Sequence, residues 1–287
     1  MLKEFELTDG SKELADVGRA ILDADRVKGQ NVLVGFAKCF DVDPAGPIFF
    51  ELLSVLRNRI HVVEEFARRV QDKELDDSLR NDVVAATKSF AKLFGPGQLV
   101  TVWDSTRASC LPEANIRTLM WFGQTARRHR PLRVVSDPER LHLIDKIDDA
   151  LRALEDDPLG SWKKAPLKNG LVRLRTVLQY FKYFGHERAI EELLLFDRKM
   201  EALNDTDEDP FNALSQPKLP SLRKVLEITA LAGTLFILPD QAVTAYDRYV
   251  TWTNRMVVTA THQPSERLLL APPIATIPRL SELPKHE

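Results

Sequence analysis

The sequence predicts a predominantly all-α fold, built as a multi-helix antiparallel bundle or an irregular helical array. Apolar residues recur at spacings of three and four along most of the chain, which is the pattern of amphipathic helices. Short turn signals separate these segments, so neighbouring helices should lie antiparallel. A very small β element stays open as an addition near 98–104 and 131–137, where QLVTVWD and PLRVVSD are short, β-branched and flanked by turn residues.

The first third of the chain predicts a short helix, a buried segment and a long helix. Ser11 supplies an acceptor side chain that can cap the first helix, and Gly29 ends it. The apolar segment NVLVGFAKCF follows. Asp43-Pro44 then starts a helix that reaches about residue 70, which we expect to be the longest in the protein. Its apolar stripe comprises Phe49, Leu52, Leu53, Leu56, Ile60, Val63, Phe66 and Val70.

The middle of the chain predicts five more helices. One runs from Asp76 to Leu93 and ends at a Gly-Pro-Gly turn, and another spans Pro112 to Arg130. Asp137-Pro138 opens the next helix, and Pro166 opens the one after it. Gly185 ends that helix and precedes the last one of this region.

Composition divides the chain into four parts. Residues 1–203 form the main helical domain, and residues 204–220 form an acidic linker that contains three prolines. Residues 221–261 predict an apolar helical hairpin, whose helices cover 221–258. Residues 262–287 are rich in proline, which excludes a helix and predicts an extended tail. Because the hairpin and the tail are apolar, they should either complete the core or bind another chain.

The composition is that of a globular protein without a transmembrane segment. The 40 basic and 42 acidic residues give a net charge of −2, so the global charge predicts neither nucleic-acid nor membrane binding. The longest apolar run, residues 228–238, is shorter than the about 20 residues that span a bilayer. The acidic N-terminus does not have the pattern of a secretory signal. Cys39 and Cys110 stand far apart, which favours free thiols and a cytoplasmic location.

One short motif in the long helix carries side chains that suit chemistry. Arg57 and His61 are four residues apart, so they project side by side from one flank of the apolar stripe. Arg57-Asn58 followed by His61 resembles the active-site motif of the HEPN RNases, which are helical dimers that cleave RNA without metal. Three residues separate Arg57 from His61, whereas that motif has four to six, and the resemblance covers five residues. The alternative is a solvated helix face, whose ion pairs contribute about 0–1 kcal/mol each.

The densest basic cluster is ARRHRPLR, residues 126–133. Arginines gathered on one face suit contacts to nucleic-acid phosphates. The alternative is the basic C-terminus of a helix, which faces the negative end of the macrodipole. A second basic patch covers 161–175, and the two would support nucleic-acid binding if they formed one surface. The candidate nucleic-acid-binding residues are Arg127, Arg128, Arg130 and Arg133.

The sequence predicts no cofactor and no metal site. It contains no phosphate-binding glycine loop, no HExxH motif and no cluster of cysteine and histidine. Asp205, Asp207 and Asp209 resemble the start of an EF-hand loop. Pro210 and Gln216, however, stand where that loop requires glycine and glutamate, so we interpret the segment as an acidic linker.

These patterns favour a non-enzymatic α-helical protein-interaction or scaffold component of a larger complex. We expect a protein partner, or a second copy of the chain, to bind through the hairpin at 221–258 and the tail at 262–287. Helical proteins without motifs often belong to bacterial multi-gene systems, including antiviral ones, and this is the expected context. Two alternatives stay open: a metal-independent RNase that uses His61 as acid/base and Arg57 for phosphate charge, and a nucleic-acid binding module that uses 126–133.

Overall fold

A computed structural model of the chain describes residues 6–24, 29–70, 75–156, 161–205 and 220–236. This part of the protein contains ten helices and one two-stranded sheet, so the predominantly all-α fold is confirmed. The strands are β1 (Leu7–Thr8) and β2 (Leu132–Arg133). The helices are α1 (Gly10–Asp23), α2 (Val32–Phe40), α3 (Pro47–Arg69), α4 (Asp77–Lys92), α5 (Trp103–Cys110), α6 (Glu113–His129), α7 (Asp137–Glu155), α8 (Ser161–Gln179), α9 (Phe181–Asp205) and α11 (Pro220–Phe236).

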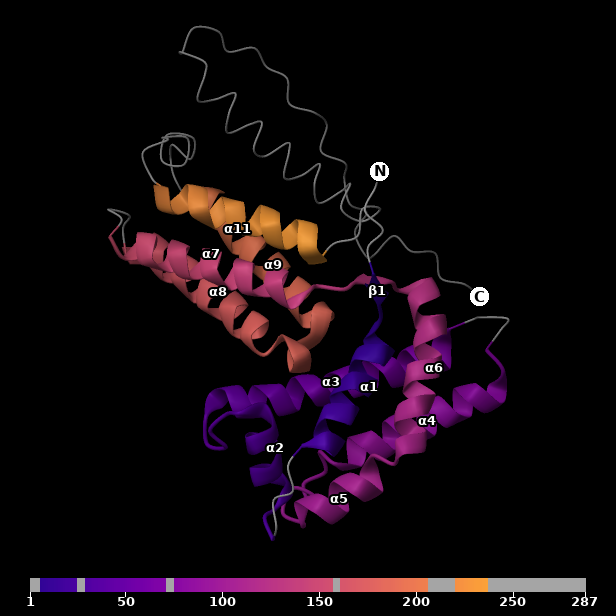
Figure 1. Ribbon diagram of the computed structural model, residues 1–287. Coiled ribbons are helices and arrows are strands. Elements are labelled where there is room, and N and C mark those ends of the chain that lie inside the picture. The colour runs from indigo at the N-terminus through magenta and orange to yellow at the C-terminus, as the bar shows by residue number, and fades with distance from the viewer. Residues whose placement is uncertain (1–5, 25–28, 71–74, 157–160, 206–219, 237–287) are drawn as a thin grey trace, which may run out of the picture.

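The helices form two groups (Figure 1). In the first, which we call the N-terminal array, α1 packs on α6, α6 on α4 and α4 on α3, while the short α2 and α5 pack on each other. In the second, the C-terminal bundle, α7 packs on α8, α8 on α9, α9 on α11 and α11 back on α7. The two groups meet where α9 contacts α1 and α3.

Side-chain caps explain where several helices begin. Asp76 accepts a hydrogen bond from the Leu79 N–H at 2.6 Å and caps α4, at the position that the sequence indicates. Ser136 and Glu139 form a capping box at the start of α7. The cap of α1 is Asp9 rather than the expected Ser11, because the Ser11 hydroxyl is buried and donates to the Leu119 carbonyl at 2.8 Å.

Two expected helix starts differ from the structure. The Asp43 carboxylate accepts from the Ala45 N–H at 3.0 Å, so Asp43-Pro44 forms a turn and α3 begins at Pro47. Pro166 does not open a helix, because α8 already begins at Ser161 and includes this proline. Gly185 does interrupt the helical path, with φ at 75° and ψ at 176° inside α9.

The small β element exists, but only one of its predicted segments forms a strand. β2 pairs antiparallel with β1, so the partner lies at residues 7–8 rather than 98–104. The segment 98–104 consists of turns, an isolated antiparallel bridge between Val102 and Asn31, and the first residues of α5. Trp103 at the start of α5 is fully buried and lies against Gly35 of α2, where an added Cβ would be 2.1 Å from the indole. Burial of this indole under α2 therefore decides the local structure.

A single contiguous cluster of buried apolar residues extends through both groups of helices. α11 contributes to it, with Val225, Ile228 and Ala232 almost completely buried. The first helix of the predicted hairpin therefore completes the core of the C-terminal bundle. The rest of the hairpin, the tail at 262–287 and most of the linker at 204–220 lie outside the described residues. None of the described helices is both long enough and apolar enough to cross a bilayer.

Candidate functional site

A surface hollow of about 460 Å³ lies along α3, on the side that faces α4. The expected residues Arg57, Asn58 and His61 all line it, so the structure brings these three side chains together. All three are exposed to solvent. The remaining lining residues are Ser54, Ile60, Glu64 and Ala91.

The charges around this hollow leave a cation and an imidazole available to a ligand. Glu64 is engaged by Arg68, which donates to its carboxylate at 2.6 Å. Among the described residues, Arg57 and His61 form no ion pair. A cation and an imidazole at spacing four can contact one phosphate group and one adjacent hydroxyl. The hollow is open, so a bound phosphate would stay largely in contact with water.

The basic cluster at 126–133 is turned mainly toward the protein itself. Arg127 forms an ion pair with the buried Asp9, with its Nε 3.3 Å from the carboxylate. The guanidinium of Arg130 lies over the ring of Phe66, with its Cζ 5.1 Å from the centroid. Arg133 pairs with Glu139.

Arg128 is exposed and donates to the Thr125 hydroxyl at 3.3 Å. The second basic patch belongs to α8, and Figure 1 places α8 in a different part of the molecule from α6. The two patches therefore do not form one basic surface.

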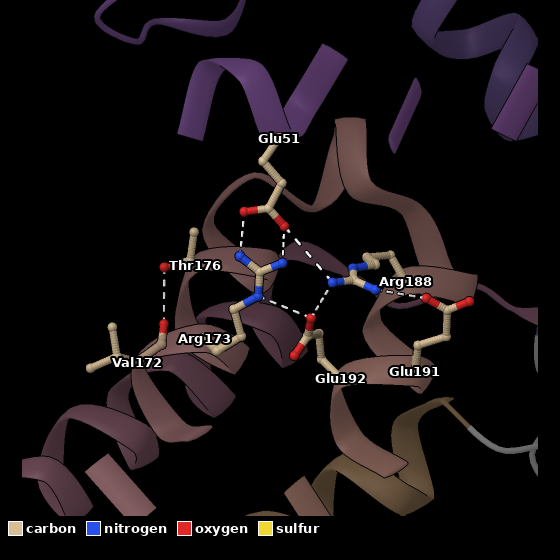
Figure 2. Close-up of polar contacts among 7 residues, drawn as sticks. All are labelled: Glu51, Val172, Arg173, Thr176, Arg188, Glu191 and Glu192. Carbon is tan, nitrogen blue, oxygen red and sulfur yellow. Dashed lines mark hydrogen bonds and ion pairs between the residues drawn. The ribbon is translucent and has the colours of Figure 1, made fainter. Parts of the chain in front are cut away.

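Arg173 of α8 and Arg188 of α9 take part in a half-buried ion-pair network that connects the two groups of helices (Figure 2). Arg173 makes a two-pronged contact with Glu51 of α3 and donates to Glu192 of α9 at 2.9 Å. Arg188 contacts Glu192 and also donates to Glu191 at 2.9 Å. This network fixes α3 against α8 and α9, and it accounts for a basic residue that the sequence offered as a phosphate contact.

A buried polar cluster at the junction was not predicted from the sequence. Arg59 of α3 donates to the Glu13 carboxylate of α1 at 2.9 Å and to the Tyr183 carbonyl at 2.6 Å. The other oxygen of Glu13 contacts Nδ1 of His186 on α9. Gly185 leaves the space for this arrangement, because a Cβ there would lie 2.7 Å from Cζ of Arg59. The signal in the sequence was Arg59 itself, which stands three residues after Leu56 and so falls within the apolar stripe of α3.

Burial and partners set the pKa values of three acids near this junction. Burial alone would raise the pKa of Glu13, but hydrogen bonding to His186 and the charge of Arg59 outweigh it and hold this pKa below the ordinary value. Burial raises the pKa of Asp9, against the opposing effect of the Lys12 N–H and Arg127. Burial likewise raises the pKa of Glu187 on α9. The junction is thus a buried polar layer in which Glu13 is held as an anion.

The outer face of α6 exposes an aromatic side chain that the core does not use. Trp121 is 65% exposed, and the neighbouring Met120 is 41% exposed. On the opposite side of the helix, Ile116, Leu119 and Phe122 are buried. α6 is therefore anchored by one face and presents Trp121 on the other.

Both cysteines are free thiols, as the sequence indicates. Burial raises the pKa of Cys39, which makes it a poor nucleophile. Within the described residues, no group of three or more histidine, cysteine, aspartate or glutamate side chains is arranged to hold a metal ion. Comparisons of the chain with protein-family models, with curated proteins and with solved structures found no match.

Proposed function

We propose that this chain is a non-enzymatic helical protein-interaction component of a larger assembly. The observation that carries the proposal is Trp121, an indole that is 65% exposed on a helix anchored in the core. Tryptophan and methionine are enriched in the centres of protein interfaces, and the indole buries a large area at a small cost in side-chain entropy. A rigid helix that presents both side chains is suited to dock against a partner. A cytoplasmic location, consistent with two free thiols, is part of this proposal.

The proposal is tested by the mass of the full chain in its native assembly. The chain is expressed with a tag in its native host, purified at low salt and measured by light scattering. We expect a mass above the 32.6 kDa of one chain. Trp121→Ala should return the mass to that of one chain, whereas the control Trp162→Ala, which removes another exposed indole from α8, should not. A mass of 32.6 kDa with no co-purifying protein would contradict the proposal.

A second candidate function is metal-independent RNA cleavage at the hollow along α3. The specific observation in its favour is that Arg57, Asn58 and His61 line one hollow. There, His61 would accept the proton of the attacking 2′-hydroxyl and return it to the 5′-oxygen that leaves as the P–O5′ bond breaks, and Arg57 would stabilise the charge that develops on the phosphate. Asn58 would orient the phosphate by hydrogen bonding.

Cleavage of a labelled single-stranded RNA in EDTA tests this candidate. His61→Ala should abolish cleavage, and the control His142→Ala, at an exposed histidine of α7, should leave the rate unchanged. Absence of cleavage by the wild-type chain, or cleavage that survives His61→Ala, would rule the candidate out.

A further inference from the structure

The exposed side of α6 has a consistent chemical character along three turns. Arg117, Trp121, Gln124 and Arg128 follow one another at spacings of four, three and four, so they lie along one face of the helix, which we call the α6 outer face. All four residues are exposed.

No acidic residue lies on α6 between Ala114 and Arg128. Glu113, at the start of the helix, is held by Arg19 of α1 in an ion pair at 2.6 Å. The face therefore combines an exposed indole with two arginines, and Glu113, four residues before Arg117, is the acidic residue of α6 nearest to it.

We infer that the α6 outer face binds an acidic segment of a partner protein. This inference rests on the proposed interaction function and names the class of its partner. Trp121 supplies the apolar contact area, and the Arg117 guanidinium supplies paired donors that match the geometry of a carboxylate. A segment that carries aspartate or glutamate beside an apolar residue complements both features.

The surroundings of this face favour a protein over a nucleic acid. The four arginines at 126–133 are engaged with groups of the chain itself, among them Asp9, Thr125, Phe66 and Glu139. A phosphate backbone repeats its charge and requires a row of available cations, whereas a short acidic segment needs one or two cations beside an apolar contact.

A library of random 12-residue peptides, displayed on phage and selected on the full chain, tests the inference directly. We expect the recovered peptides to be more acidic than the unselected library. The double variant Arg117→Glu/Trp121→Ala should bind them about tenfold or more weakly, because it reverses the charge and removes the aromatic contact.

The matched control is Arg198→Glu/Trp162→Ala, which makes the same two changes at exposed positions of α9 and α8 and should bind them as the wild type does. Because all four changed side chains are exposed, both variants should show the wild-type circular dichroism spectrum and melting temperature.

Several outcomes would overturn the inference. These are recovery of no peptide, recovery of neutral or basic peptides, or equal weakening in the control variant. A 20-nucleotide single-stranded RNA that binds the wild type and is lost in the Arg117→Glu/Trp121→Ala variant would assign the face to nucleic acid instead. The light-scattering mass separates failure of this inference from failure of the proposed function. An assembly that forms but persists in Trp121→Ala would use a surface other than the α6 outer face, whereas a wild-type chain that forms no assembly would contradict the proposed function itself.

Discussion

At the scale of single residues, the most consequential feature is the carboxylate of Glu13 in the buried junction. Arg59 and His186 both contact it, and both side chains are almost completely buried. Burial of an ion pair is costly, and such a pair persists only when hydrogen bonds satisfy it well. Here Arg59 also satisfies the Tyr183 carbonyl, so one guanidinium connects α1, α3 and α9.

Loss of the Arg59 side chain should therefore destabilise the fold strongly. Arg59→Met leaves Glu13 buried with one partner fewer, and we expect the free energy of unfolding to fall by about 3–5 kcal/mol. Arg69→Met is the control, because Arg69 pairs with Glu65 at the surface and its loss should cost less than about 1 kcal/mol. Urea denaturation measures both values, and equal effects of the two substitutions would contradict this role of Arg59.

The raised pKa of Glu187 predicts how the stability of the fold changes with pH. Its pKa is raised by burial, so the folded protein loses stability as the pH rises through the ordinary and then the raised pKa of this carboxyl. Glu187→Gln keeps the neutral form at every pH. The variant should match the wild type near pH 4 and be more stable than the wild type at pH 7. Glu191→Gln, at an exposed neighbour, should show no such divergence, and a Glu187→Gln variant less stable at pH 7 would refute the assignment.

At the scale of elements, α11 decides how the C-terminal part of the described chain is organised. Its buried residues pack mainly on α7, and Phe236 lies near Phe181 and His186 of α9. This helix completes the C-terminal bundle, whereas the sequence alone left open whether the hairpin serves the core or a partner. The distinction matters because the apolar side of α11 is already covered.

Ile228→Ala tests this placement. The side chain is 1% exposed, so its truncation should lower the free energy of unfolding by about 2–5 kcal/mol. Leu194→Ala removes a half-exposed side chain from α9 and should change stability by less than about 0.5 kcal/mol. If α11 were reserved for a partner, Ile228→Ala would leave the isolated chain as stable as the wild type.

The elements also show what the sequence can and cannot predict. Local signals located α4 and α7, because a capping side chain and an apolar stripe act within a few residues. β1 was missed because two residues carry no periodic signal and their partners, Arg133 and Leu132, lie more than a hundred residues further along the chain. The possible strand at 98–104 did not form for a similar reason. The burial of Trp103 beneath α2 is a tertiary contact, and it outweighs the β-branched character of the neighbouring residues.

In the candidate site, too, local spacing predicted some features and the packing of the helices decided others. Spacing along α3 placed Arg57 and His61 on one flank, and both line the hollow together with Asn58. The engagement of Arg127, Arg130 and Arg133 by other parts of the chain depends on how the helices pack, which no local pattern reveals.

At the scale of the whole molecule, two groups of helices share one apolar core and are joined by polar contacts. The Glu13 cluster lies at the junction of α1, α3 and α9, and the Arg173 network holds α3 to α8 and α9. Such a body is rigid enough to present α6 in a fixed orientation. We propose that this body offers a binding surface, to which Trp121 contributes an exposed indole.

Hydroxyl-radical footprinting of Trp121 tests this central claim most directly, because indole rings oxidise readily when water reaches them. The full chain is footprinted in its native assembly and again as the purified chain. We predict that Trp121 is protected in the assembly and oxidised in the isolated chain, while Trp162 is oxidised in both. Equal oxidation of Trp121 in the two samples would contradict the account.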